Sequence, residues 1–143
     1  MRTALDTNIL SAILTREVRA EVAQTALLEA RRRGSLVLSG AAYAELIASP
    51  GASSALIERV LSVTDIQPDF TADELLWFTA GQAYGEYAQR RRASSGGSPR
   101  RILADFLIGA HARLRADALI TFDPQHYRLS FPDLKLAVPG EAS

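Results

Sequence analysis

The chain of 143 residues contains no cysteine, a single lysine and two histidines. Without cysteine it has no disulfide, no thiolate zinc site and no cysteine nucleophile, and this composition suits a reducing compartment. The histidines, His111 and His126, lack the spacing of a zinc motif. Long apolar runs are missing as well. The longest stretch without a charge, the twelve residues 46–57, falls well short of the about 20 residues that a membrane span needs. We therefore expect no membrane partner.

Charged residues stand close to the start of the chain, at Arg2 and Asp6, and leave no room for the apolar core of a signal peptide. A cytoplasmic protein is therefore expected. With 48% hydrophobic and 22% charged residues, the chain has the composition of an ordinary globular protein. We predict a single domain over residues 1–143.

The charges balance in number but are segregated in position. Sixteen basic and sixteen acidic residues give a net charge of zero, which by itself predicts no nucleic-acid partner. However, residues 90–101 hold five arginines and no acid, whereas residues 65–74 hold four acids and no base. Every basic residue except Lys135 is an arginine, and arginine binds phosphate in a bidentate manner. This bias permits a phosphodiester substrate without requiring one.

Apolar stretches of strand length alternate with helical patterns along the chain. We predict strands at 2–5, 35–39, 63–67, 118–121 and 134–138. The intervening helices include one over 17–33 that ends at Gly34, one that a capping box at 71–74 opens and that runs to about residue 89, and one opened by Ser98-Pro99. The segment 93–98 is predicted to be a loop. Short strands separated by single helices indicate an α/β fold with helices on both faces of a mainly parallel sheet of four to five strands.

Four acids lie near the ends of these predicted strands. Asp6 directly follows the first strand, Glu45 lies on the helix after the second, and Asp123 follows the fourth by two residues. Asp105 is placed in the second turn of the helix that Ser98 caps. Ligands of parallel sheets bind beyond the carboxyl ends of the strands. This pattern therefore places the side chains of Asp6, Glu45 and Asp123 at that edge of the sheet, and Asp105 can face the same crevice.

Each acid also has a purely structural alternative. Asp6 can cap the following helix, and Asp123-Pro124 is a common opening of a turn. Glu45 and Asp105 stand among apolar neighbours, where a lone carboxylate needs a partner or a cation. For Asp105 the alternative partner is Arg101, one turn earlier.

Carboxylates that converge require compensation. Two of them 4 Å apart repel by about 4 kcal/mol at an effective dielectric constant near 20. A hard divalent cation provides that compensation, and oxygen ligands suit Mg²⁺ or Mn²⁺. Such a site activates water for phosphodiester hydrolysis and needs no side-chain nucleophile.

Four motifs in succession resemble those of the PIN-domain ribonucleases, and more closely the VapC toxins of type II toxin–antitoxin modules. They are Leu5-Asp6-Thr7-Asn8-Ile9-Leu10, Ala42-Tyr43-Ala44-Glu45-Leu46, residues 104–112 around Asp105, and Leu119-Ile120-Thr121-Phe122-Asp123. The resemblance covers nearly the whole chain. It implies a PIN-like three-layer α/β/α sandwich, an RNA substrate, Mg²⁺ or Mn²⁺ as cofactor, a small cognate antitoxin and a homodimer. By position, Asp6, Glu45, Asp105 and Asp123 match the catalytic, metal-binding acids, and Asn8 and Thr121 match polar residues that support the site.

The basic segment departs from the commonest form of that family, because it is longer and richer in glycine, serine and arginine. Its arginines flank the helix that carries Asp105, where they can hold RNA phosphates on either side of the scissile bond. Their alternative role is that of a solvated helix end. The arginines concerned are Arg90, Arg91, Arg92, Arg100 and Arg101.

Aromatic residues and one histidine also admit two interpretations. Trp77, Phe78, Tyr84 and Tyr87 share one helix and can stack on bases, although core or dimer contacts are the favoured interpretation. For His111, within an apolar helix, we favour local packing or hydrogen bonding over a role as general base.

Two other classes of phosphate-processing protein do not match these residues. A haloacid-dehalogenase-type phosphotransferase needs a second aspartate two residues after the first, where this chain has Asn8. Gly96-Gly97 is not followed by the lysine of a phosphate-binding loop. The remaining alternative is a PIN-like domain that binds RNA or protein without cleaving. The sequence favours a metal-dependent endoribonuclease.

Overall fold

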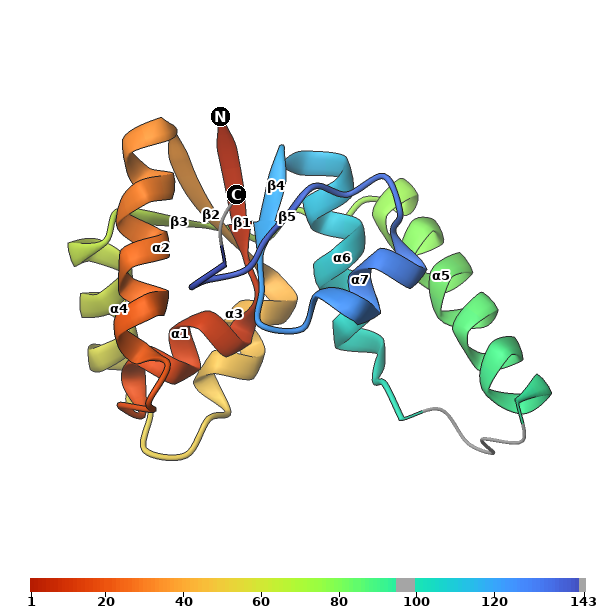
Figure 1. The fold of residues 1–143 in the computed structure, drawn as a ribbon, viewed down its shortest axis with the longest axis horizontal. Coiled ribbons are helices and arrows are strands. Elements are labelled where there is room, and N and C mark those ends of the chain that lie inside the picture. The colour runs from red at the N-terminus through yellow and green to blue at the C-terminus, as the bar shows by residue number, and fades with distance from the viewer. Residues whose placement is uncertain (95–99, 142–143) are drawn as a thin grey trace.

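The computed structural model describes residues 1–94 and 100–141. Within them the chain alternates between strands and helices (Figure 1). In chain order the elements are β1 (Arg2–Leu5), α1 (Thr7–Leu14), α2 (Ala20–Arg33), β2 (Ser35–Ser39), α3 (Gly40–Ile47), α4 (Ser54–Val63), β3 (Ile66–Asp69), α5 (Glu74–Ala93), α6 (Leu103–Arg115), β4 (Ala118–Ile120), α7 (Pro124–Ser130) and β5 (Leu136–Ala137). None of these helices is both long and apolar enough to cross a membrane.

The five strands form one sheet in the order β3-β2-β1-β4-β5, and all neighbouring pairs are parallel. Strand β1 lies in the centre, with Thr3 opposite Leu36 of β2 on one side and Ala118 of β4 on the other. In Figure 1 the sheet stands between α2 and α4 on one side and α5, α6 and α7 on the other. The predicted α/β/α sandwich is therefore confirmed, with a sheet that is parallel throughout.

The central strands are apolar where they are most deeply buried, at residues 4–5, 36–38 and 118–120, because helices cover both faces of the sheet. Leu5, Leu36, Leu38 and Leu119 are almost completely buried. From α6, Phe106 packs into the same core and contacts the rings of Tyr84 and Tyr87 on α5. This core fixes the carboxyl ends of β1, β2 and β4 relative to one another.

Local signals in the sequence explain several boundaries. Ser39, Ser53 and Asp73 cap α3, α4 and α5, because each side chain accepts a hydrogen bond from a main-chain N–H in the first turn. Gly34 ends α2 as predicted, and the reason is a close approach of the backbone. A Cβ atom at this position would lie 1.8 Å from the carbonyl oxygen of Met1, so only glycine allows the neighbouring Ser35 N–H to bond that oxygen at 2.9 Å.

Some predicted boundaries were wrong. Helix α2 begins at Ala20 instead of Glu17, and residues 17–19 belong to the connection that follows Arg16, whose φ is positive at 54°. Asp73 caps α5 in place of Thr71, and the helix continues past Gln89 to Ala93. The third strand runs through Pro68 instead of ending before it. Proline is tolerated there because β3 is an edge strand.

The start of α6 also differs from the prediction. Ser98-Pro99 and most of the predicted loop 93–98 lie outside the described residues, but the helix begins only at Leu103, with Ile102 as the N-cap residue. The Asp105 carboxylate accepts a hydrogen bond from the Ile102 N–H at 3.1 Å. Asp105 therefore lies in the first turn of α6, not in the second turn of a longer helix.

Candidate functional site

The structure brings the four predicted acids to one hollow at the carboxyl ends of the strands. Asp6 follows β1, Asp123 follows β4, Glu45 lies on α3 after β2, and Asp105 lies in the first turn of α6. All four line a hollow of about 290 Å³, which we call the carboxylate hollow. Its other lining residues are Thr7, Asn8, Ser11, Glu17, Arg101 and Tyr127.

Asp6 is the most buried of the four and the most heavily hydrogen-bonded. One carboxylate oxygen accepts the Thr7 N–H at 2.8 Å, so Asp6 also caps α1. The other accepts bonds from the Thr121 hydroxyl at 2.7 Å, the Tyr127 hydroxyl at 3.1 Å and the Asn8 amide at 3.3 Å. The structural alternative for Asp6, capping of α1, is thus present. Asn8 and Thr121, the two residues predicted to support the site, both contact Asp6 directly.

Burial changes the acidity of Asp6. Loss of hydration raises the pKa of its carboxyl from 3.8 to about 6, with a further contribution from the negative charge of Asp105. The hydrogen bonds from Thr121, Tyr127 and Thr7 act in the opposite direction. Burial, followed by the charge of Asp6, also raises the pKa of the Tyr127 hydroxyl. Tyr127 therefore remains a neutral donor to Asp6.

The other three acids are held by single neighbours. The Thr7 hydroxyl donates to Glu45 at 2.7 Å, and Asp105 accepts from the Ile102 N–H. Asp123 forms an ion pair with the guanidinium of Arg101, and both side chains are about one third exposed. The alternative that Arg101 pairs with Asp105 was therefore wrong, because the tertiary structure offers Asp123 instead.

Thr121 connects two of the acids. Its hydroxyl donates to Asp6 and accepts the Asp123 N–H at 2.9 Å. The amide of Asn8 makes a second connection, since its oxygen accepts the Phe122 N–H at 3.3 Å. These bonds fix the segment after β4 against the start of α1, so the relative position of Asp6 and Asp123 is determined by side chains as well as by the sheet.

Sequence reasoning missed several residues of the carboxylate hollow. Glu17 was assigned to a helix, but it lies between α1 and α2 and adds a fifth acid. Arg19 does not line the hollow, but its guanidinium stacks over the Phe122 ring at 4.0 Å and joins the α1–α2 connection to the segment that carries Asp123. Tyr127 was missed too. A helix predicted over 124–130 would have indicated Tyr127, because residues four apart on a helix lie on the same face and Tyr127 is four residues after Asp123.

The donor set of the carboxylate hollow suits a hard divalent cation, because its acids supply oxygen ligands and repel one another. In the described residues, however, no three histidine, cysteine, aspartate or glutamate side chains form a group able to hold a metal ion. The Asp123 carboxylate is engaged in the ion pair with Arg101. The acids thus provide the oxygen ligands of a metal site, but among the described residues they are not spaced to hold a metal ion.

A second hollow, of about 580 Å³, adjoins the first and shares Arg101 and Asp105 with it. We call it the basic hollow, because four of the five predicted arginines line it. They are Arg90, Arg91, Arg100 and Arg101, whereas Arg92 is exposed and does not line it. Other walls come from α5 and α7, including Tyr87 and His126.

The remaining candidates lie away from the carboxylate hollow. His111 is buried and its Nε2 is 3.0 Å from Asp69, as expected for a local hydrogen bond. Burial lowers the pKa of His111 despite that carboxylate, so we treat the contact as a hydrogen bond of a neutral ring. Of the aromatic residues on α5, Tyr84 and Tyr87 pack on Phe106, whereas Trp77 and Phe78 are more than half exposed.

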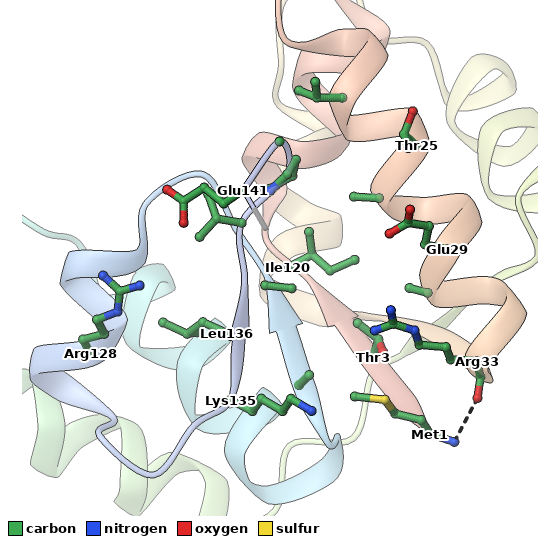
Figure 2. Close-up of a pocket in the computed structure, with 18 residues that line it drawn as sticks. Met1, Thr3, Thr25, Glu29, Arg33, Ile120, Arg128, Lys135, Leu136 and Glu141 are labelled. Atoms are coloured by element: carbon green, nitrogen blue, oxygen red, sulfur yellow. Dashed lines mark hydrogen bonds between the residues drawn. The ribbon is translucent and has the colours of Figure 1, made fainter. Parts of the chain in front are cut away.

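A further hollow of about 560 Å³ lies between α2 and the C-terminal segment (Figure 2). Its charged lining residues include Glu29 and Arg33 of α2, Arg128 and Lys135. None of the four predicted acids lines it. Size alone therefore does not identify the candidate site; the concentration of carboxylates does.

The model of the PIN domain matches residues 3–132 of the chain. This chain belongs to the PIN-domain family. The assignment places it in a nuclease class whose members generally use divalent metal. No curated protein matched the chain.

Solved structures share the fold of this PIN domain. VapBC2 from Rickettsia felis, solved bound to a DNA fragment from its promoter, contains a chain 20% identical, with a TM-score of 0.64 over 97% of this chain and 99% of that chain. VapBC-1 from nontypeable Haemophilus influenzae contains a chain that is 24% identical, with a TM-score of 0.63 over 96% of this chain and 98% of that chain. FitAcB from Neisseria gonorrhoeae contains a chain that is 20% identical, with a TM-score of 0.60 over 94% of this chain and 95% of that chain. At these identities the likeness shows the fold.

Proposed function

We propose that this PIN domain is a metal-dependent endoribonuclease, and that Asp6, Glu45, Asp105 and Asp123 are its catalytic, metal-binding residues. The observation that carries the proposal is the meeting of all four carboxylates in one hollow beside a hollow lined by arginines. Acidic and basic hollows side by side suit a reaction in which a cation and a polyanion must bind together.

A bound Mg²⁺ or Mn²⁺ would supply activation of water and compensation of the charge that develops on the phosphate. The protein's own contribution is to place the ligands. Asp6 is fixed by Thr121, Tyr127 and Asn8, and Glu45 is fixed by Thr7. Because the neutral hydroxyls donate to carboxylate oxygens, they orient the remaining lone pairs towards the hollow.

The RNA would lie across the basic hollow, with its phosphates near Arg90, Arg91, Arg100 and Arg101. Arg92, which is exposed close by, would add long-range attraction. Because these arginines would contact phosphates and not bases, they would provide affinity for RNA without sequence preference. Any contacts to bases would come from the surrounding side chains. An RNA substrate would place the protein in the cytoplasm.

We further propose that the protein is the toxin of a type II toxin–antitoxin module and is inhibited by a small cognate antitoxin. The support is the resemblance of its four motifs to VapC toxins, together with the shared fold of the VapBC and FitAcB chains. A homodimer is proposed as well. Exposed apolar side chains near the start of α5 offer a surface for it, namely Phe70, Leu75, Trp77 and Phe78.

Cleavage of a mixed RNA pool tests the function. The wild-type protein should cleave with Mn²⁺ and lose this activity in EDTA. Asp105→Asn should reduce the rate at least about 100-fold, because it removes a charged ligand from the proposed metal site. Asp133→Asn is the matched control, since this exposed acid makes only an ion pair with Arg113 at 3.4 Å and lies outside the carboxylate hollow.

Two outcomes would contradict the proposal. Cleavage that persists in EDTA and in Asp105→Asn would reject the metal mechanism. RNA binding without cleavage in any condition would instead favour the alternative, a PIN-like domain that binds RNA or protein without cleaving. Comparison with Asp133→Asn separates these results from a general effect of charge or folding.

A further inference from the structure

Arg101 occupies a special position, because it lines both hollows. In the carboxylate hollow its guanidinium pairs with Asp123 and lies within electrostatic range of Asp105. The same side chain forms part of the wall of the basic hollow. Among the described residues that line the carboxylate hollow, Arg101 is the single base beside five acids.

The main chain at Arg101 is anchored independently of its side chain. The hydroxyl of Tyr87 on α5 accepts hydrogen bonds from the N–H groups of Arg100 and Arg101, at 3.1 and 3.2 Å. Because Tyr87 packs on Phe106 of the core, these bonds fix the Cα position of Arg101 at the boundary between the hollows. The arginine side chain, about one third exposed, can then exchange partners without a movement of the backbone.

The guanidinium acts on Asp123 as a cation. A divalent ion and a guanidinium cannot both neutralise the same carboxylate at full strength, because the two cations repel each other. Arg101 is therefore a competitor of any metal that uses Asp123. It is also a ligand that RNA phosphates can recruit from the other side, since arginine forms bidentate bonds with phosphate.

We propose that Arg101 has two positions, and that it couples metal binding to RNA binding. Paired with Asp123, it holds the carboxylate hollow in an arrangement in which no three acids of the described residues are grouped for a metal. When a divalent cation takes Asp123, Arg101 is released into the basic hollow and binds the phosphate next to the scissile bond. This inference rests on the proposed function and assigns Arg101 a substrate-binding role within it.

The proposal predicts effects of opposite sign in Arg101→Ala. Without the competing guanidinium, Mn²⁺ measured by calorimetry in the absence of RNA should bind roughly fivefold more tightly, the upper range for loss of a partly exposed ion pair. At saturating Mn²⁺ the same variant should raise the KM for RNA cleavage roughly tenfold, because one phosphate contact is lost. Arg101→Lys keeps a charge but not the bidentate geometry, so both effects should be smaller.

Arg100→Ala provides the control for the metal titration. Arg100 lines the basic hollow but not the carboxylate hollow, so its removal should leave the Mn²⁺ affinity within about twofold of wild type. Equal increases in Arg100→Ala and Arg101→Ala would attribute the effect to general charge and overturn the proposal. Thermal unfolding of each variant verifies that the fold is retained.

The remaining outcomes are also decisive. An unchanged or weaker Mn²⁺ affinity in Arg101→Ala would show that Arg101 does not compete with the metal for Asp123. Tighter Mn²⁺ binding with an unchanged KM would show that Arg101 does not bind an RNA phosphate in a second position. In either case a wild-type protein that still cleaves RNA with Mn²⁺ would leave the proposed function intact. A wild-type protein that neither binds Mn²⁺ nor cleaves RNA would reject both.

Discussion

The buried carboxyl of Asp6 should make the stability of this PIN domain depend on pH in a distinctive way. Its pKa is raised from 3.8 to about 6 by burial, so the folded protein holds this proton more tightly than the unfolded chain does. Stability is therefore lost as pH rises from about 4 to above 6, and the loss is complete above that range. The pKa change corresponds to about 3 kcal/mol of unfolding free energy.

Urea unfolding of wild type and Asp6→Asn in EDTA measures this effect. Other groups titrate over the same range, but they are common to both proteins and cancel in the difference. Asparagine accepts fewer hydrogen bonds than aspartate, and this loss lowers the stability of Asp6→Asn by an amount that does not depend on pH. We therefore expect the stability of Asp6→Asn relative to wild type to improve by about 3 kcal/mol between about pH 4 and pH 8.

Two results would refute this reasoning. A difference in unfolding free energy that does not vary with pH would show that Asp6 keeps an ordinary pKa in the folded protein. A difference that moves in favour of wild type as pH rises would show that the hydrogen bonds outweigh burial. Saturating Mn²⁺ offers a check on the proposed metal site, because a cation beside Asp6 should lower its pKa and stabilise wild type at high pH but not Asp6→Asn.

Three further changes test single contacts. Thr121→Val removes the donor that lowers the pKa of Asp6, so this pKa should rise further and the acidic limb of the cleavage rate should move to higher pH in a pH–rate profile. Asp69→Asn should lower the free energy of unfolding, measured in urea at neutral pH, by about 2–4 kcal/mol, because Asp69 accepts bonds from Arg2, His111 and Arg115. Burial raises the pKa of Asp69, but the bonds from Thr71, His111 and Arg115 outweigh burial and lower it. The loss of stability should therefore shrink as pH falls below about 4. Gly109→Ala should lower stability by about 1–3 kcal/mol, since the new Cβ would lie 2.2 Å from the Phe131 ring, and an unchanged midpoint would contradict that packing.

The main elements of the fold follow from local features of the sequence. The stretches 2–5 and 35–39 became β1 and β2 with the predicted bounds, because their apolar residues 4–5 and 36–38 are buried in a sheet that is covered on both faces. The start of α6 was not predictable in the same way. Ser98-Pro99 is a strong local signal, but the helix begins where the Asp105 carboxylate caps the Ile102 N–H and where Tyr87 holds the chain before it.

For the site, the sequence by itself determined which carboxylates stand beyond the strands and that their oxygen-rich chemistry suits a hard cation. Spacing relative to the apolar runs placed Asp6, Glu45 and Asp123 past strand ends, since parallel strands end at one edge of the sheet, whereas Asp105 joins them through the packing of α6. Only the tertiary structure decided their partners. Arg101 is one turn from Asp105 in sequence yet pairs with Asp123, and Glu17 joins the hollow from a connection between helices. Such contacts depend on how separate elements pack, and the energy of an ion pair depends on distance and burial, which sequence separation does not specify.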